Sequence, residues 1–289
     1  MVHAASCRPA LDSSCSRRPA SAVAVCEWFG AATIRFVVLF RGDATKPYSD
    51  GCMSRTMPLS ASVVVPAYNE ETRLANALDS LADQDAEVVV VACGDGSLDV
   101  ARSHDAADVV LEDGDGTGAG AARNQGAQAA TGDVVLFTDA DTVVPPHWVE
   151  AHRRHFEDPA VVGTGGPLRP LEAGLKHRVL FKLLSDWWYR VSWPVGFVQQ
   201  SGNNAGFLRE AFLAEGGFDE ELAFMEDTEL SMRMKHHGEM VYDPDCWVET
   251  SVRRQEAKGY GGLFLTYLRA YLNHYLLHRE LEDGYFREL

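Results

Sequence analysis

The sequence lacks any uncharged apolar run long enough to cross a bilayer. Its most apolar N-terminal stretch, residues 20–40, is interrupted by Glu27 and Arg35, whereas a spanning helix needs about 20 consecutive apolar residues. Cysteine is sparse too, with six residues and none in CxxC spacing. A disulfide scaffold is therefore excluded, and the cysteine pattern argues against a zinc site.

Positive charge is in short supply. The chain holds 26 Lys plus Arg against 42 Asp plus Glu, a formal net charge of −16. Such a surface argues against a protein that wraps a nucleic-acid backbone. With 289 residues, 46% of them apolar, the chain can still bury the core of one large domain or two small ones, and disorder of the whole chain is excluded.

The first 56 residues differ in composition from the rest. They hold seven Lys or Arg, only four Asp or Glu and four of the six cysteines, and they show no sustained period of 2 or 3.6. We predict a poorly ordered N-terminal extension at residues 1–57, followed by one domain at residues 58–289. A twin-arginine signal at Arg17-Arg18 and a translation start at Met53 or Met57 are both left open.

From Ala61 onward, β-rich apolar runs alternate with helical patterns. A run such as the four valines at 88–91 is typical of a strand buried on both faces, so we predict an α/β fold with a single, mostly parallel sheet flanked by helices. Ligands of such sheets bind at the carboxyl ends of the strands. The predicted strands are 62–65, 87–92, 108–111 and 133–137, and the predicted helices are 70–82, a short helix from 97, and 119–130.

Six short motifs lie at these strand ends and further along the chain. They are VVVPAYNEE at 63–71, DGSLD at 95–99, ARNQG at 122–126, the aspartates of 132–141 (GD to DAD), GGFDE at 216–220 and ED at 226–227. In this order and spacing they resemble family 2 glycosyltransferases of the GT-A fold, over about residues 60–250. The resemblance implies an enzyme that moves a sugar from a nucleoside diphosphate donor with inversion, and it does not name the sugar.

Asp139 and Asp141 stand one residue apart at the end of an apolar strand. Two carboxylates so placed can converge on one divalent cation. The resemblance implies that they hold Mg²⁺ or Mn²⁺ against the donor diphosphate, where the metal stabilises the leaving group. The alternative is a pair of turn-forming aspartates, which are common after strands.

The turn after the first strand and the matching point of the second frame a pocket. The resemblance implies that this pocket holds the nucleotide, with Asp95 accepting a hydrogen bond from the base. Gly94 stands where the family usually has a second aspartate, which leaves the base unassigned. Helix capping and first-turn charge are the structural alternatives. The remaining predicted nucleotide-binding residues are Pro66, Ala67, Tyr68 and Glu70.

A glycine-rich segment at 113–121 opens the helix that carries Arg123. We predict that its backbone approaches the diphosphate and that Arg123 makes a charge-assisted contact with it; a surface ion pair is the alternative. Gly116, Gly118 and Ala121 also satisfy the G-x-G-x-x-A pattern of dinucleotide binders. An NAD-dependent oxidoreductase is therefore the rival function, although this loop follows the third strand and leaves the aspartate pair unexplained.

Glu226 and Asp227 open a predicted helix that continues to residue 237. A helix N-terminus fixes the direction of a carboxylate. The resemblance implies that Asp227 is the general base that takes the proton of the acceptor hydroxyl, with Glu226 in support; a plain helix cap is the alternative. A catalytically silent nucleotide-sugar-binding module is a further candidate, but it would have no use for this base.

Arg253 and Arg254 stand where many relatives carry a basic motif that closes over the diphosphate. We predict that both bind the donor, with a solvated charge pair as the alternative. The Q-x-x-R-W motif of processive polysaccharide synthases is absent, which favours transfer of a single sugar. The GGFD segment at 216–219 resembles the acceptor-side loop, and residues 202–204 (GNN) are expected to line the same cleft.

Two segments combine an apolar helical stripe with polar residues. In residues 175–193 a basic face lies opposite Leu, Phe and Trp, and residues 263–276 repeat the apolar stripe. Packing against the sheet and contact with a membrane interface both account for this pattern. In the second case a lipid-linked acceptor, such as a polyprenyl phosphate or its glycoside, follows, with the enzyme in the cytoplasm or on the cytoplasmic face of the membrane. The basic face comprises Lys176, His177, Arg178, Lys182 and Arg190.

Overall fold

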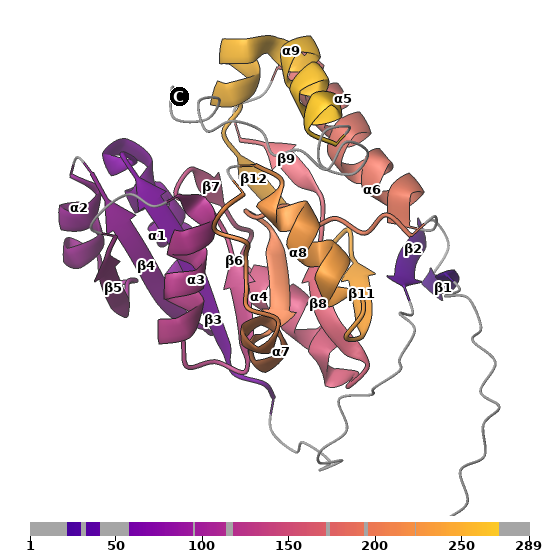
Figure 1. Ribbon diagram of the computed structural model, residues 1–289, viewed down its shortest axis with the longest axis horizontal. Helices are drawn as coiled ribbons and strands as arrows, with labels where there is room; N and C mark the ends of the chain where they lie inside the picture. The colour runs from indigo at the N-terminus through magenta and orange to yellow at the C-terminus, as the bar shows by residue number, and fades with distance from the viewer. Residues whose placement is uncertain are drawn as a thin grey trace, which may run out of the picture.

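The computed structural model describes residues 58–94, 96–113, 118–171, 174–193, 196–222 and 224–271, together with the backbone of 22–29 and 33–40. These residues form a nine-stranded sheet with helices on both faces and a three-stranded sheet beside it (Figure 1). Within the described part, no helix has both the length and the apolar character needed to cross a membrane.

The elements alternate along the chain as the sequence predicts. The strands are β1 (Ala22–Phe29), β2 (Thr33–Phe40), β3 (Ala61–Tyr68), β4 (Glu87–Cys93), β5 (Val109–Glu112), β6 (Val134–Phe137), β7 (Thr142–Val143), β8 (Val161–Gly165), β9 (Leu168–Pro170), β10 (Ala205–Leu208), β11 (Glu239–Tyr242) and β12 (Val248–Thr250). The helices are α1 (Glu71–Leu81), α2 (Ser97–Ser103), α3 (Ala119–Ala129), α4 (Trp148–Arg153), the 3₁₀ turn η2 (Arg154–Glu157), α5 (Leu175–Phe181), the π-helical η3 (Lys182–Trp187), α6 (Trp188–Ser192), α7 (Arg209–Ala214), α8 (Glu226–Met234) and α9 (Arg253–Tyr271).

The large sheet has the strand order β1-β2-β11-β8-β10-β6-β3-β4-β5. Strands β6, β3, β4 and β5 are all parallel to one another, which confirms the predicted parallel sheet. The antiparallel pairs lie beyond β6, where β10 is inserted between β6 and β8 and where β2 pairs with β11. The small sheet has the order β7-β12-β9.

Both faces of the central strands are buried, which explains their continuous valines. Val63 and Val65 face one core, packed against Leu74 and Leu78 of α1. Val64 faces the opposite core, with residues of α3, α7 and α8. Because successive side chains of a strand point to opposite faces, a strand covered on both sides must be apolar throughout.

The N-terminal segment contains two strands that the sequence pattern does not predict. Within residues 1–57, which we predict to be poorly ordered, β1 and β2 pair antiparallel with each other, and β2 extends the large sheet by pairing Phe40 with Met240 of β11. The rest of that segment lies outside the described residues. The division into 1–57 and 58–289 therefore stays a prediction.

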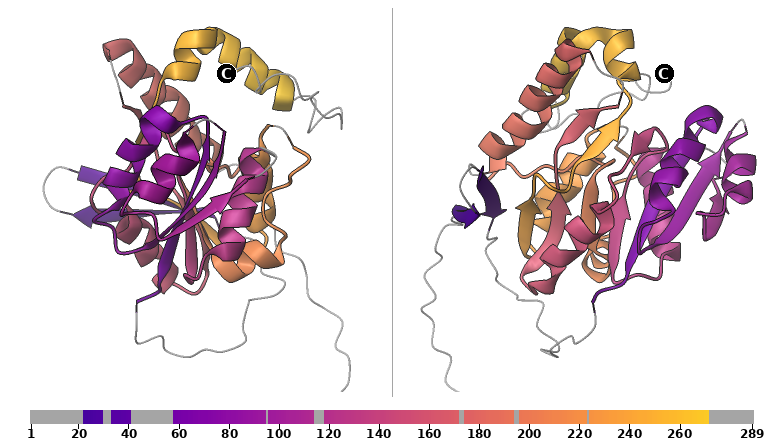
Figure 2. Two further views of the ribbon diagram at one scale, coloured as in Figure 1. Left: turned by 90° about the vertical axis from the view of Figure 1, so that its left-hand side faces the viewer. Right: turned by 180° about the vertical axis from the view of Figure 1, so that it is seen from behind.

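Helices α5, η3 and α6 run on from one another at residues 175–192, and α9 lies beside them at the same end of the molecule (Figures 1 and 2). The predicted helical conformation of 175–193 and of the start of 263–276 is confirmed; residues 272–276 lie outside the described residues. Gly259 has a φ of +70° and bends α9 into two parts, a conformation that favours glycine.

Helix α3 lies unusually close to the sheet because Gly126 has no side chain. A Cβ atom there would lie 2.3 Å from Cγ1 of Val64 and 3.2 Å from Cγ2 of Val91. We expect Gly126→Ala to lower the free energy of unfolding by about 1–2 kcal/mol, since overpacking must push the helix away from the sheet. Denaturant unfolding measures the change.

Gly120 provides a matched control on the same helix. A Cβ atom at this position would meet its nearest neighbour, Cβ of Phe218, at an ordinary 3.5 Å. Gly120→Ala should leave stability unchanged or raise it by up to about 1 kcal/mol through helix propensity. Equal effects of the two substitutions would contradict the close-packing account.

Candidate active site

Three carboxylates meet at the carboxyl ends of two neighbouring strands. β3 and β6 are paired in parallel, so Glu70, which follows β3, and Asp139 and Asp141, which follow β6, share one edge of the sheet. The negative charges of Asp139 and Glu70 both act on Asp141. The structure thus brings together the predicted aspartate pair and one predicted nucleotide-binding residue.

Arg253 joins two of these carboxylates from the far end of the chain. It begins α9, and its guanidinium bonds Glu70 through both terminal nitrogens, while Nη2 also lies 3.3 Å from Oδ2 of Asp141. The side chain is 33% exposed. Arg254 next to it is exposed, and its charge lowers the pKa of Asp141.

Burial and neighbouring charge set the protonation of Asp141. Desolvation, followed by the charges of Asp139 and Glu70, raises its pKa to about 6, even though Arg253 and Arg254 oppose this shift. Like charges close together disfavour ionisation. The carboxylate group is therefore short of positive charge, which is the condition under which a cation binds favourably.

Arg123 lies at the centre of the site. Its Nη2 donates to Oδ1 of Asp139 at 2.8 Å, and its Nη1 donates to Oε1 of Glu226 at 3.1 Å, with only 5% of the side chain exposed. The guanidinium also lies 5.4 Å from the ring centroid of Phe218. Because Arg123 is buried and has two carboxylate partners, it is not the surface ion pair that was the alternative prediction for this residue.

Gly202 allows the backbone to approach this arginine. A Cβ atom at Gly202 would come within 2.9 Å of Cζ of Arg123. The same residue donates its backbone N–H to Oδ2 of Asp227 at 3.0 Å. Gly202 thus lies against both the guanidinium and the predicted base.

Asp227 is held by backbone donors at the start of α8. Oδ2 accepts the N–H of Gly202, and Oδ1 accepts the N–H of Thr228 at 2.7 Å. Desolvation, followed by the charge of Glu226, raises its pKa to about 6, while these hydrogen bonds and Arg123 oppose the shift. The group is therefore fixed in direction and titrates near neutral pH.

Met225, which precedes Glu226 and Asp227, has the left-handed conformation, with φ +69° and ψ +17°. A buried non-glycine residue rarely adopts this conformation, and such strain is typical of functional sites. The turn sets the direction in which α8 begins, and thus where Glu226 and Asp227 project. The sequence pattern gives no sign of it.

The predicted nucleotide residues have different exposures. Tyr68 is 63% exposed, Pro66 is half-buried, and Ala67 is 3% exposed with its methyl group in the core. Any contact of Ala67 with a ligand would therefore be made through its backbone. Asp95 and residues 114–117 of the glycine-rich segment lie outside the described residues, so their predicted roles are not addressed by the structure.

Asn204 does not line the cleft, contrary to expectation. It is fully buried, and its side chain accepts from Nε1 of Trp148 at 3.0 Å and donates to the carbonyl of Cys246 at 2.7 Å. It joins α4 to the connection between β11 and β12. Asn203, by contrast, donates to Oγ1 of Thr250 at 3.3 Å from a half-buried position.

Tyr267 is a neighbour of the predicted base that sequence reasoning missed. Its ring packs 4.8 Å from that of Phe224. Burial of the hydroxyl and the charge of Asp227 raise its pKa to about 12, although 45% of the residue as a whole is exposed. The apolar stripe of 263–276 includes this residue, but the stripe alone does not indicate that α9 folds back toward Asp227.

A second set of ligand-type side chains includes Asp243, which follows β11, three strands along the sheet from β6. Donor atoms of His155, Asp243 and Cys246 lie within 4.8 Å of one another. Oδ2 of Asp243 already accepts from His155 at 2.7 Å and from Arg154 at 2.5 Å. These bonds hold the pKa of Asp243 well below its ordinary value and account for the buried carboxylate without a metal.

The chain is similar in sequence to a known protein family and to several known proteins. Residues 62–213, more than half of the chain, match the family model described as Glycosyl transferase family 2. The pre-mycofactocin glycosyltransferase of Mycobacterium tuberculosis is 30% identical over 206 residues, which cover 67% of this chain and 43% of that protein. The glucosyl-dolichyl phosphate glucuronosyltransferase of Haloferax volcanii is 29% identical over 56% of each chain. The chain spans from about a quarter to just over half of the length of these and the other curated relatives that it matches.

Solved structures share the fold. The mannosyltransferase PcManGT from Pyrobaculum calidifontis, solved with GDP-Man and Mn²⁺, has a TM-score of 0.52 and 23% identity over 78% of this chain and 68% of its own. S. aureus TarS 1–349, solved with UDP-GlcNAc, has a TM-score of 0.54 and 21% identity over the same shares. The predicted GT-A fold is thereby confirmed.

The raised pKa of Asp141 predicts a gain in stability when its charge is removed. Its pKa is about 6 in the folded protein against an ordinary 3.8, so the folded state binds a proton more tightly, and the free energy of unfolding falls as pH rises from about 4 to about 6. We expect Asp141→Asn to raise the free energy of unfolding at pH 8 by about 2 kcal/mol. The gain should shrink toward zero near pH 4.

Denaturant unfolding at several pH values checks this expectation. Asp105→Asn, at an exposed position between α2 and β5, is the control, and it should change the free energy of unfolding little at any pH. A loss of stability in Asp141→Asn at pH 8, or a gain that does not depend on pH, would contradict the charge crowding inferred for this site.

Proposed function

The chain belongs to glycosyl transferase family 2, and on this premise we propose that it transfers a single sugar, with inversion, from a nucleoside diphosphate donor to an acceptor hydroxyl or phosphate. One observation carries the proposal. Buried Arg123 ties Asp139, at the strand end where a donor diphosphate would bind, to Glu226, which neighbours the predicted base Asp227.

Asp139 and Asp141 would hold a divalent cation, Mg²⁺ or Mn²⁺. The donor set fits, because carboxylate oxygens are the ligands that these hard cations prefer, and burial together with the charges of Asp139 and Glu70 raises the pKa of Asp141. When bound, the cation would stabilise the charge of the departing diphosphate. The Mn²⁺ with which PcManGT was solved supports this choice.

The donor would bind along the same edge of the sheet. We propose that Pro66, Ala67, Tyr68, Glu70 and Asp95 surround the base and ribose. Two solved neighbours carry GDP-Man and UDP-GlcNAc, which supports a nucleotide-sugar donor without choosing its base.

Three arginines are available to the diphosphate. Arg123 is fixed by its two carboxylates, whereas Arg253 is a third exposed and Arg254 is exposed. Guanidinium groups bind phosphate oxygens through paired, charge-assisted hydrogen bonds. We propose that Arg253 and Arg254 neutralise the diphosphate from the α9 side, and Arg123 from the α3 side.

Asp227 would act as the base in one displacement. Its carboxylate takes the proton of the acceptor hydroxyl while the acceptor oxygen forms a bond to the anomeric carbon. The bond from that carbon to the diphosphate oxygen breaks, and its electron pair leaves with the diphosphate, so configuration inverts. A pKa of about 6 keeps Asp227 ionised at neutral pH and still basic enough to accept the proton.

The acceptor is proposed to be lipid-linked, as in glycoconjugate assembly at the cytoplasmic face of a membrane. The name of the Haloferax volcanii relative, which includes a dolichyl phosphate, supports this class. The comparisons give no support to the oxidoreductase alternative. A silent binding module differs from an enzyme in leaving the donor intact, and release of nucleoside diphosphate distinguishes the two.

Donor binding should depend on the metal and on Asp139. Calorimetry of the full chain with UDP, GDP and dTDP should show binding of one nucleotide that tightens at least tenfold with Mn²⁺, by about 1.4 kcal/mol. Asp139→Ala should remove the metal effect, and Asp105→Ala should retain it. Tight binding of NAD without metal would refute the proposal.

Transfer should depend on the ionised form of Asp227. We expect Asp227→Asn to lower kcat by a factor of about 10²–10⁴ with donor affinity nearly unchanged. In the unmodified chain, kcat/KM should fall about tenfold per pH unit below pH 6, because the base becomes protonated. Rates measured from pH 5 to 8 test this, and a rate that stays constant down to pH 5 would rule out a base with this pKa.

A further inference from the structure

Exposed large apolar residues are concentrated on two neighbouring helical segments. Eleven of the fourteen found among the described residues lie there. On α5, η3 and α6 these are Leu175, Val179, Leu183, Leu184, Trp187, Trp188 and Val191, and on α9 they are Phe264, Leu265, Tyr267 and Leu268. The exposed fraction reaches 78% at Leu175 and 58% at Trp187. We call this set the apolar-basic face, together with the basic residues of the same helices.

The two segments are in contact. Nδ1 of His177 on α5 lies 2.8 Å from the hydroxyl of Tyr260 on α9, and Nζ of Lys176 lies 5.8 Å from the ring centroid of Tyr260. Both views place these helices together at the end of the molecule that is farthest from α7 (Figures 1 and 2). The two segments thus lie together at this end of the molecule.

The charge of this side is opposite to that of the whole chain. Apart from Arg253 and Arg254, which belong to the proposed donor site, residues 175–192 and 255–271 contain six Lys or Arg and only two acidic residues, whereas the whole chain carries −16. One of the two, Asp186, is paired with Arg190 at 2.6 Å and accepts from the hydroxyl of Tyr242 at 3.1 Å. The surface therefore offers positive charge beside exposed tryptophan and leucine.

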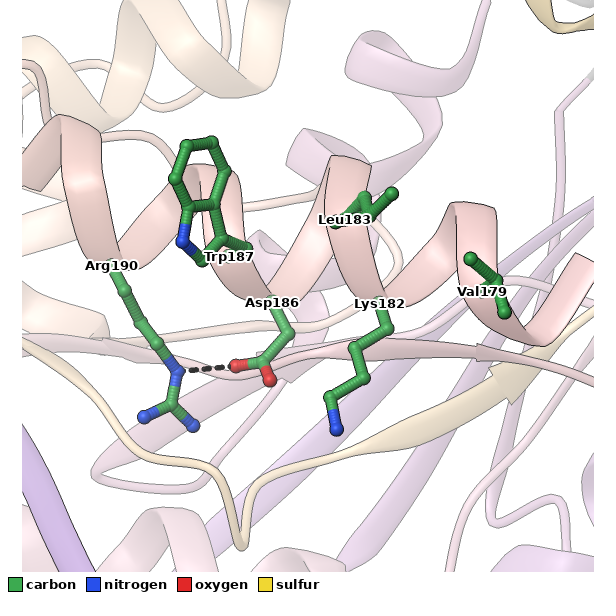
Figure 3. Close-up of a pocket in the computed structure, with 6 residues that line it drawn as sticks. All are labelled: Val179, Lys182, Leu183, Asp186, Trp187 and Arg190. Carbon is green, nitrogen blue, oxygen red and sulfur yellow. Dashed lines mark hydrogen bonds and ion pairs between the residues drawn. The ribbon is translucent and has the colours of Figure 1, made fainter.

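The close-up of the helix shows how the two kinds of side chain are separated. Lys182, Asp186 and Arg190 extend to one side, whereas Leu183 and Trp187 point to the other (Figure 3). An apolar side with tryptophan, flanked by basic side chains, is the arrangement by which a helix lies in the plane of a membrane interface. The alternative of sheet packing would have buried these residues.

We propose that the apolar-basic face docks on a bilayer that contains anionic lipid. Tryptophan and leucine would enter the interfacial region, and Lys176, Arg178 and Lys182 would contact lipid phosphates. A twofold contact between two copies would place this positive face against itself, which charge disfavours. The inference rests on the proposed function, and it names the membrane as the source of the acceptor.

The face is joined to the site by α9. Arg253 at the start of the helix binds Glu70 and Asp141, and Tyr267 further along packs on Phe224, two residues before Glu226. A protein docked through this helix would hold its proposed base close to the bilayer surface. An acceptor anchored in the lipid could then reach Asp227 without leaving the membrane.

Vesicle co-sedimentation of the full chain tests the proposal. Vesicles with phosphatidylglycerol should pellet the protein at least tenfold better than vesicles of phosphatidylcholine alone, and high salt should reduce this difference. Leu183→Asp should lower the partition coefficient at least tenfold. Leu213→Asp, at an exposed position on α7, should leave it unchanged.

Tryptophan quenching by lipids with brominated acyl chains locates the contact. Of the six tryptophans, Trp148 and Trp193 are fully buried, and the guanidinium of Arg169 lies 3.8 Å from the ring centroid of half-buried Trp247. Most of the quenching should therefore come from Trp187 and Trp188 and be lost when both are replaced by phenylalanine. Donor binding of each variant, measured by calorimetry without vesicles, should be unchanged. Because this readout is separate, loss of membrane binding is distinguishable from failure of the proposed catalysis.

Several outcomes would overturn the proposal. The first is that the protein does not pellet with anionic vesicles, and the second is that it pellets equally well with neutral ones. The third is that Leu183→Asp and Leu213→Asp lower the partition coefficient equally. Sedimentation velocity without lipid provides a further test. A dimer that dissociates in Leu183→Asp would assign the face to a second copy of the chain instead of a bilayer.

Discussion

The buried guanidinium of Arg123 is the interaction on which the rest of the site depends. A charge taken out of water is tolerated only when partners compensate it, and here the partners are Asp139 after β6 and Glu226 at the start of α8. Removing either would leave a buried charge partly unpaired. The donor edge of the sheet and the helix of the proposed base are therefore fixed to each other through one side chain, and the close approach of Gly202 completes its enclosure.

Around that arginine the site carries more negative charge than its own residues neutralise. Arg123 and Arg253 each bond two carboxylates, Asp139 with Glu226 and Glu70 with Asp141, and the charge of Glu226 also acts on a fifth carboxylate, Asp227. Such crowding costs folding free energy, and it is tolerated where a ligand supplies the missing charge. The left-handed turn at Met225 adds strain at the same place. Both features lower stability at this place, a cost that proteins commonly carry at functional sites.

Local pattern was sufficient to predict the central sheet and the edge at which Glu70, Asp139 and Asp141 meet. The valines of β3 and β4 and the DAD segment after β6 depend on residues adjacent in sequence, and these predictions place Glu70, Asp139 and Asp141 correctly at one edge. Contacts between distant segments escaped prediction. The bonds of Arg123 to Glu226 and of Arg253 to Glu70 join residues 103 and 183 positions apart, and the burial of Asn204 depends on Trp148. The pairing of β2 with β11 also lacked any periodic signal.

The pairing of β2 with β11 determines where the chain can be shortened without exposing a strand edge. β11 lies at the boundary of the sheet formed by residues from Ala61 onward, and β2 occupies its open side over Met240–Tyr242. An uncovered strand presents a row of free backbone donors and acceptors to which another polypeptide can add. A polypeptide beginning at Met57 would uncover that row, so truncation there would exchange an intramolecular strand contact for a tendency to self-association through sheet extension.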